Sequence, residues 1–341
     1  MNKELNIATV GAGVIAPFHF HAMKSVNNAN VVAICDIDES KATKFAQENK
    51  IEYSTNLDDL LNNPDIDVID VTVPSGYHAD IGIAAARAGK HVIVEKPIDV
   101  TLEKADQLIN TCKENGVTLM VISQNRFLNS VMTVAKAVAN KELGTLVQGS
   151  AYIKWYRSQE YYNSGAWRGT VELDGGGCLM NQGIHFIDLL LSMMGPVKSV
   201  TAKTKIIDHD IQVEDIAMAL LEFESGAFGV IEGSTSGYPG LPARLEICGN
   251  KGTAIVEGER LALLHVDGKD PIKDPEQEKV GGAATPTNID LSPFIRQFTD
   301  FVDAVHNKRD PIISGIVARR PLQLILAIYE SSRTGKPVSL S

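Results

Sequence analysis

Short apolar runs alternate with amphipathic segments over the first third of the chain. The apolar runs are rich in Val and Ile and end in Gly, Pro or Asp, which is typical of buried strands. We predict strands over 6–13, 30–36, 67–75, 91–97 and 117–127, separated by helices over 17–25, 39–50, 55–66, 77–90 and 101–116. Strands that alternate with helices form parallel sheets through right-handed crossovers. The pattern therefore predicts a doubly wound (Rossmann) parallel sheet over residues 1–125.

The pattern changes near residue 143, where strands begin to follow one another directly. The predicted strands are 143–157, 197–207, 214–224, 227–236, 243–249, 252–258 and 260–266. Short glycine turns join several of them, as between antiparallel neighbours. Helices are expected within 174–190, over 293–308 and over 315–334, and a long polar loop or flap over 267–290. Residues 126–341 should thus form an α+β domain with a large, mostly antiparallel open sheet.

One face of such a sheet packs on helices, and the other face needs a cover. A second copy of the chain is the usual cover, so we expect a homodimer or a homotetramer. We expect residues 126–341 to bind the substrate and to mediate oligomerisation.

Composition restricts the classes of function. The 341 residues are 44% hydrophobic, enough for two folded domains, and no apolar run is long enough to span a membrane. The net charge of -10, without a basic cluster, argues against nucleic acid as a partner. Four dispersed cysteines indicate reduced thiols, and the first strand begins too early to leave room for a signal peptide. We therefore expect a cytoplasmic protein without a membrane or nucleic-acid partner.

The first predicted turn has the sequence GAGVIA and lies between a strand and a helix. In this context Gly11 permits the tight turn, Gly13 lets the backbone approach a pyrophosphate, and Ala16 keeps the helix close to the sheet. Val14 and Ile15 lie at the helix N-terminus, whose free N–H groups attract phosphate. A tight turn that binds no ligand is the alternative interpretation. The turn predicts a dinucleotide site.

Cofactor choice depends on the residue that ends the second predicted strand. Asp36 follows Ala16 by twenty residues, where a carboxylate can accept hydrogen bonds from an adenosine ribose. The same carboxylate repels a 2′-phosphate, and the next residue, Ile37, brings no positive charge. Lys41 could partly compensate. The sequence therefore favours NAD over NADP.

Polar residues also follow the later strands, at the edge where such sheets bind ligands. Pro74, Ser75 and His78 follow one strand, and Glu95 and Lys96 follow the next. The proline after Lys96 holds this lysine in an extended conformation. An ordinary surface lysine is the alternative, but we expect these residues to contribute to the cofactor site.

A glycine triplet precedes a helix-like run in DGGGCLMNQGIHFIDLL, residues 174–190. On an α-helix, Asn181 and His185 lie four residues apart and share a face, while Ile184, Ile187 and Leu191 can point to the core. Residues 175–177 have no side chains, so a ligand could approach their backbone. The alternative is a flexible linker and a core helix in which His185 has a backbone partner.

Aromatic residues and arginines are dense just before these glycines. The candidates for a polyol pocket are Tyr156, Trp167 and Arg168, with Arg126 as a weaker one. Aromatic faces stack on the C–H surfaces of sugars, and arginines bind hydroxyl or carboxylate oxygens. The same residue types mark protein–protein interfaces, which is the alternative interpretation.

GAGVIA, AGKHVIVEKP and GGGCLMNQGIHFID together resemble the Gfo/Idh/MocA family, named for glucose–fructose oxidoreductase and inositol dehydrogenase. The resemblance covers essentially the whole chain. It implies an oxidoreductase that uses NAD or NADP on a carbon–oxygen bond of a sugar, cyclitol or related molecule. It also implies that Lys96 and His185 are catalytic. The family often has aspartate where this chain has Asn181, whose amide can orient a hydroxyl but carries no charge.

A mechanism follows from the ordinary pKa values of these groups. Histidine, with a pKa of about 6.5, suits acid–base duty, whereas lysine starts at about 10.4. We assign proton transfer to His185 and orientation of the oxygen to Lys96, although the reverse division stays open. An NAD-dependent glycosidase or lyase and a non-catalytic dinucleotide sensor are the alternative functions. No metal is expected.

Overall fold

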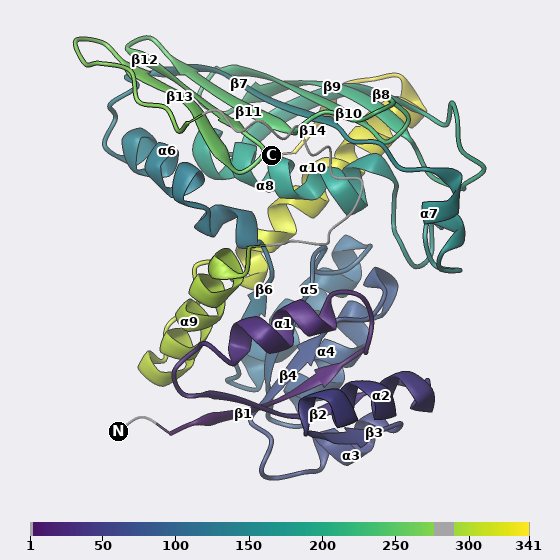
Figure 1. Cartoon of the computed structure of the whole chain (residues 1–341). Coiled ribbons are helices and arrows are strands. Elements are labelled where there is room, and N and C mark those ends of the chain that lie inside the picture. Colours follow the sequence, from purple (N-terminus) through teal and green to yellow (C-terminus); the bar gives the residue numbers. More distant parts are fainter. Residues whose placement is uncertain (1–2, 276–289, 341) are drawn as a thin grey trace. The chain divides into compact units, whose positions relative to one another are not determined.

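The computed structural model describes residues 3–275 and 290–340 (Figure 1). These residues form two compact units. The first unit contains Met1–Gln124 and Asp290–Arg319, and the second contains Asn125–Ile289 and Arg320–Ser341. Each unit is built around one sheet.

The sheet of the first unit has six parallel strands in the order β3-β2-β1-β4-β5-β6. The strands are β1 (Leu5–Val10), β2 (Ala29–Cys35), β3 (Glu52–Ser54), β4 (Val68–Val71), β5 (His91–Val94) and β6 (Leu119–Val121). Ile7, Ile69 and Ile93 are at most 1% exposed and form the centre of the core. The strand order reverses between β1 and β4, and ligands of doubly wound folds bind beside that point. The predicted Rossmann sheet is confirmed, with β3 as a strand that sequence reasoning missed.

Helices connect the strands as expected from the sequence. They are α1 (Ala16–Met23), α2 (Glu39–Asn49), α3 (Leu57–Leu61), α4 (His78–Arg87) and α5 (Leu102–Glu114), with a short 3₁₀ turn η1 (Ser75–Tyr77) before α4. Asp38 and Thr101 accept hydrogen bonds from the first turns of α2 and α5, which explains where these helices begin.

The unit boundary differs from a single cut at residue 125. Helix α9 (Ser292–Asn307) belongs to the first unit although it lies late in the sequence. Its Phe294 and Phe298 pack against the ring of His19 in α1, and Gln297 binds the backbone of β6 and its following loop. Apolar burial and buried amide hydrogen bonds therefore attach this helix to the Rossmann core.

The second unit contains an eight-stranded sheet in the order β13-β12-β11-β7-β10-β9-β8-β14. The strands are β7 (Leu146–Lys154), β8 (Val197–Lys205), β9 (Ile216–Phe223), β10 (Phe228–Ser234), β11 (Arg244–Gly249), β12 (Gly252–Glu257), β13 (Arg260–Val266) and β14 (Val338–Ser339). Within this eight-stranded sheet, as far as the structure describes it, only the β7–β10 pair is parallel. The mostly antiparallel sheet predicted from the sequence is confirmed.

Helices cover one face of this sheet. They are α6 (Asn129–Ala139), α8 (Ile184–Met194) and the later part of α10 (Gly315–Thr334), and Figure 1 shows all three below the strands. A 3₁₀ turn η2 (Gln124–Phe127) precedes α6, and the short helix α7 (Gln159–Asn163) follows β7. Sequence reasoning missed α6 and α7. The predicted loop over 267–290 falls largely outside the described residues, and Leu264 and Ile272 pair as an isolated bridge near its start.

Candidate active site

The turn after β1 has the geometry of a phosphate-binding loop. Gly11 has φ of 105°, and a Cβ there would lie 2.9 Å from the Thr72 carbonyl carbon and oxygen. The space around Gly13 is open, since the nearest heavy atom to a Cβ there would be 3.9 Å away. Ala16 is fully buried at the start of α1. The residues of this turn therefore suit the pyrophosphate of a dinucleotide, as their spacing predicted.

Asp36 directly follows β2, and its carboxylate is fixed beside the glycine turn. One oxygen accepts a hydrogen bond from the Ala12 backbone N–H at 2.7 Å, and the other accepts one from the Asp38 N–H at 2.8 Å. Ile37 is 95% exposed. A fixed carboxylate at this strand end suits the ribose of NAD and disfavours a 2′-phosphate.

The loop after β4 is joined to the loop after β5 by His78. This histidine is 1% exposed, and its ring nitrogens lie 2.7 Å from the Pro97 carbonyl oxygen and 2.8 Å from the Val73 carbonyl oxygen. Burial lowers the pKa of His78. The ring therefore joins these two loops. Between Val73 and His78 in the sequence, Pro74 is half-buried and Ser75 is buried.

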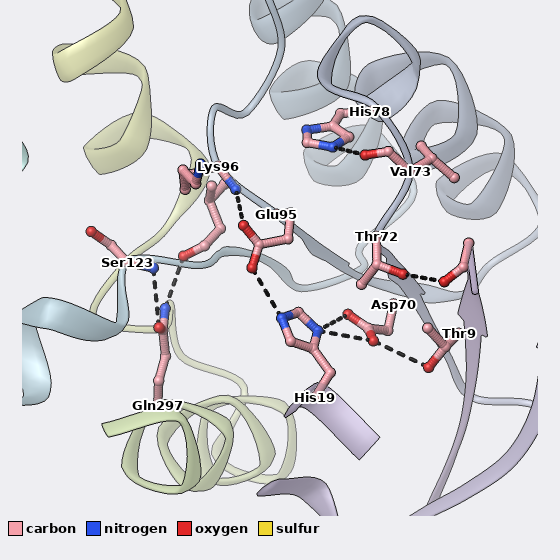
Figure 2. A network of polar contacts seen from close by, with 12 residues as sticks. Thr9, His19, Asp70, Thr72, Val73, His78, Glu95, Lys96, Ser123 and Gln297 are labelled. Carbon is pink, nitrogen blue, oxygen red and sulfur yellow. Dashed lines mark hydrogen bonds and ion pairs between the residues drawn. The ribbon is translucent and has the colours of Figure 1, made fainter. Parts of the chain in front are cut away.

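Glu95 and Lys96 lie at the end of β5, in a network of buried polar groups (Figure 2). The Glu95 carboxylate accepts a hydrogen bond from the Lys96 backbone N–H at 3.0 Å and contacts a ring nitrogen of His19 at 3.0 Å. Both of its oxygens thus have partners inside the protein. Lys96 is half-buried. Sequence reasoning missed His19, because its partners are 51 and 76 residues away along the chain.

The helix that carries His185 begins later than predicted. Residues Cys178–Gly183 form a single π-helical turn, η3, and α8 starts at Ile184. Asn181 therefore lies on η3 and His185 on α8, which corrects the expectation of one continuous α-helix.

The burial of this segment nonetheless agrees with the prediction that Asn181 and His185 share an exposed face. Between residues 176 and 191, Asn181 and His185 are half-buried, whereas every other residue is buried. Ile184, Ile187 and Leu191 point to the core as predicted, with exposures of 4%, 0% and 9%. The polar pair is thus the accessible part of an otherwise enclosed segment.

Two acidic residues hold this segment in place. Glu214, which precedes β9, accepts hydrogen bonds from the backbone N–H groups of Gly177 at 2.9 Å and Leu179 at 3.0 Å, and from the Tyr329 hydroxyl at 2.9 Å. Desolvation raises the pKa of the Glu214 carboxyl above its usual range. Asp174 accepts a hydrogen bond from the Asn181 side-chain amide at 2.7 Å. Neither residue was found from the sequence, because an acid before a strand or a glycine run has no distinctive spacing.

The glycine triplet packs against the protein itself. A Cβ at Gly176 would lie 2.2 Å from the Tyr329 hydroxyl, and one at Gly177 would lie 1.7 Å from the Glu214 carbonyl oxygen. At these two positions the space expected for a ligand is filled by Tyr329 and the backbone of Glu214. The physical reason for glycine here is close packing of the segment that carries Asn181 and His185.

The predicted substrate residues have different surroundings in the structure. Arg126 forms a bidentate pair with the buried Asp188 of α8, with Nε 2.6 Å from Oδ2. Its guanidinium thereby stabilises the helix of His185. Tyr156 lies edge-to-face with Tyr238, which is 82% exposed.

Arg168 has a different environment. Its guanidinium lies over the rings of Tyr161 and Trp167, at 4.3 Å and 4.5 Å, and donates to the Tyr161 hydroxyl at 2.6 Å. The same hydroxyl accepts a hydrogen bond from Gln182 of η3 at 3.1 Å. Arg168 also lines a pocket of about 370 Å³ with Tyr162 and Gly169. The Tyr161 hydroxyl therefore connects Arg168 to η3, which carries Asn181.

Within residues 3–275 and 290–340, no three His, Cys, Asp or Glu side chains are grouped so that they could hold a metal ion. Over the same residues, no helix combines the length and apolarity that a membrane span requires.

The Rossmann sheet, the open glycine turn and the acid after β2 define a dinucleotide-binding protein, and the second unit presents a half-buried histidine beside an oriented amide. Residues 5–123 match the oxidoreductase family with an NAD-binding Rossmann fold, and residues 131–255 match the Gfo/Idh/MocA C-terminal domain. The chain belongs to this oxidoreductase family, as its motifs predicted.

Individual relatives agree with this assignment. The chain is 26% identical to the scyllo-inositol 2-dehydrogenase (NAD(+)) of Bacillus subtilis, over 100% of this chain and 97% of the relative. It is 26% identical to the D-apiose dehydrogenase of Paraburkholderia graminis, over 99% of this chain and 90% of the relative. The WlbA dehydrogenase of Bordetella pertussis, solved with NADH and UDP-GlcNAcA, is 30% identical with a TM-score of 0.86, over 100% of this chain and 99% of that one.

Proposed function

We propose that this protein is an NAD-dependent dehydrogenase that interconverts a secondary alcohol and a ketone on a sugar, cyclitol or sugar derivative. The observation that carries the proposal is the exposure of Asn181 and His185 within a segment that is otherwise buried. The similarity to inositol and apiose dehydrogenases and to a dehydrogenase solved with UDP-GlcNAcA supports the substrate class.

The residues that would hold NAD are those of the first unit. The turn of Gly11, Gly13, Val14, Ile15 and Ala16 suits the pyrophosphate, and Asp36 suits the adenosine ribose. Pro74 and Ser75 flank this site in the loop after β4. NAD, when bound, supplies the group that accepts hydride from the carbon being oxidised.

The protein supplies proton transfer and orientation. A ring nitrogen of His185 accepts the proton of the substrate hydroxyl and returns it in the reverse direction. The ammonium of Lys96 orients the oxygen and stabilises its developing negative charge. Donation to Asp174 fixes the Asn181 amide, so that the amide can orient a neighbouring hydroxyl without contributing charge. Arg168, whose guanidinium lies over two aromatic rings, would bind oxygens of the substrate.

Production of NADH from a panel of sugars, cyclitols and sugar nucleotides tests the proposal. A dehydrogenase releases one NADH for each molecule of product. A glycosidase or lyase that oxidises its substrate transiently consumes no net NAD, and a sensor turns over nothing. Product formation without NADH would contradict the proposal.

Asp36→Ala should narrow the preference for NAD over NADP. Removing the carboxylate loses a hydrogen-bond acceptor for the ribose and relieves repulsion of a 2′-phosphate, so we expect a change of about tenfold in the ratio of dissociation constants. Calorimetric titration of both cofactors measures it. Glu39→Ala, at an exposed neighbouring position, is the control for a general charge effect. Tighter binding of NADP by the parent protein would contradict the assignment.

We further propose that the chain is a cytoplasmic homodimer or homotetramer without nucleic-acid or membrane partners. Met218, Leu220 and Phe228 are 53%, 54% and 57% exposed on β9 and β10, on the face opposite the helices. An apolar sheet face of this kind is suited to contact with a second copy. Light scattering should give a multiple of 36.9 kDa, and Leu220→Glu should lower it. A monomer at micromolar concentration would contradict this use of the face.

A further inference from the structure

His19 lies at the centre of a buried charge cluster in the first unit (Figure 2). The side chain, from α1, is 0% exposed. Its Nδ1 lies 3.0 Å from Asp70 Oδ1, and its Nε2 lies 3.0 Å from Glu95 Oε1. With both carboxylates ionised, each ring nitrogen donates to one of them, because a carboxylate accepts hydrogen bonds and cannot donate them. The arrangement suits an imidazolium between two carboxylates.

The surroundings keep this charge at neutral pH. Burial alone would lower the pKa of His19, but the carboxylates of Asp70 and Glu95 outweigh burial and raise it to about 10. Thr9 donates a further hydrogen bond to Asp70 at 3.2 Å. Phe294 and Phe298 of α9 pack on the imidazole, with ring centroids 5.6 Å and 5.2 Å away. A buried ion of this kind persists because its partners fix it, and loss of one partner is costly.

The cluster leads directly to the backbone of Lys96. Glu95 Oε2 accepts the Lys96 backbone N–H at 3.0 Å, while the other oxygen of the same carboxylate faces His19. The Glu95 backbone N–H also donates to the Val71 carbonyl oxygen, at 3.0 Å. One chain of hydrogen bonds thus runs from Asp70 of β4 through His19 of α1 and Glu95 to the backbone amide of Lys96, the second residue after β5. His19 thus joins the carboxylate of Asp70 on β4 to that of Glu95, which follows β5.

We propose that His19 is a positioning residue that sets the place of Lys96 through the Glu95 carboxylate. The inference rests on the function proposed above, in which Lys96 orients the reacting oxygen. Without the imidazolium, Glu95 loses the cation that fixes its rotamer, and the Lys96 backbone loses a fixed acceptor.

His19→Gln tests this role. The amide is neutral and can keep one carboxylate contact but not both charge-assisted contacts. We expect faster hydrogen exchange at the Lys96 amide, measured by mass spectrometry of the peptide that contains it. We also expect kcat to fall by roughly tenfold to a hundredfold, because a small misplacement of a catalytic group is expensive. A merely structural histidine would lower the melting temperature without changing kcat below it.

Two further variants complete the design. His21→Gln changes the exposed histidine of the same helix and should leave exchange, kcat and NAD affinity unchanged. Glu95→Gln removes the carboxylate and should show the same faster exchange at Lys96 and the same fall in kcat as His19→Gln. It provides the same test if His19→Gln does not fold. The double variant should be no worse than Glu95→Gln alone, since residues that act in series are not additive.

Unchanged exchange at Lys96 in a folded His19→Gln protein overturns the inference, and so does faster exchange with unchanged kcat. Lys96→Met separates this failure from that of the proposed function. If Lys96→Met loses turnover while His19→Gln keeps it, the inference fails and the proposed function stands. If Lys96→Met keeps turnover, the assigned role of Lys96 fails and the inference fails with it.

Discussion

His185→Ala should lower turnover by roughly 10²–10⁴, the usual contribution of a general acid–base group. The side chain is half-buried beside Asn181, in a segment that Glu214 and Asp174 hold in place through other atoms. The substitution therefore removes the imidazole without removing the contacts that form the segment. Affinity for NAD should be unchanged, because the proposed phosphate and ribose contacts belong to the other unit.

The dependence of turnover on pH gives the sharper test of the same variant. A histidine that accepts a proton must be neutral, so the parent should lose activity as the pH falls through the histidine pKa, near 6.5 in ordinary surroundings. His185→Ala should lack this acidic limb. His265→Ala, at an exposed position on β13 of the same unit, is the matched control and should behave as the parent does. If His185→Ala kept both rate and pH profile, His185 would be a packing residue, and proton transfer would pass to Lys96.

The fold could be predicted from the sequence because its elements repeat a simple pattern. Buried strands with Val and Ile alternate with helices in the first unit, and β9 and β10 of the second unit bury every second residue. The misses have local causes. Strand β3 has three residues and no buried side chain, so it carries no periodic signal. Helix α9 lies after strands β7 to β13 of the second sheet in sequence, and nothing local shows that its phenylalanines cover His19 of the first unit.

The sequence could predict those residues of the candidate site that lie within a recognisable local motif. The glycine turn, Asp36, Lys96 and His185 each have a spacing or a flanking residue that marks them. His19, Asp174 and Glu214 have no such mark, because they act through partners that are distant in sequence or through backbone N–H groups. Arg126 shows the converse case. It has the residue type of a substrate ligand, yet its guanidinium is paired with Asp188.

The glycine triplet shows why a flexible sequence need not mean an open site. Three successive glycines suggest space for a ligand, but the atoms that approach two of them come from Tyr329 and Glu214. Glu214 can accept N–H groups from Gly177 and Leu179 because its own backbone lies against Gly177. Close packing and the fixed position of η3 are therefore consequences of the same contact. The accessible chemistry begins one turn later, at Asn181.

Gly177→Ala should consequently be among the most damaging substitutions in the second unit. Its Cβ would lie 1.7 Å from the carbonyl oxygen of Glu214, and two backbones cannot separate by rotating a side chain. Because only a backbone movement can relieve this overlap, we expect a loss of more than about 4 kcal/mol in the free energy of unfolding, or no soluble protein. Few single substitutions have so large an effect. At Gly176 the nearest obstructing atom is the Tyr329 hydroxyl, at the end of a side chain, and Met180 Cβ would lie 2.8 Å away. Gly176→Ala should therefore cost about 1–3 kcal/mol, the effect of displacing a buried hydrogen-bond partner.

Gly237→Ala is the matched control, because no atom lies within 4 Å of a Cβ placed there. Denaturant unfolding of the three variants should give the order Gly237, Gly176, Gly177 from least to most destabilised. In the Gly176 variant, a displaced Tyr329 hydroxyl would also weaken the support of Glu214 and slow turnover. Equal stability of the Gly177 and Gly237 variants would mean that η3 can move away from Glu214 at no cost. The segment of Asn181 and His185 would then owe its position to Asp174 and the packing of α8 alone.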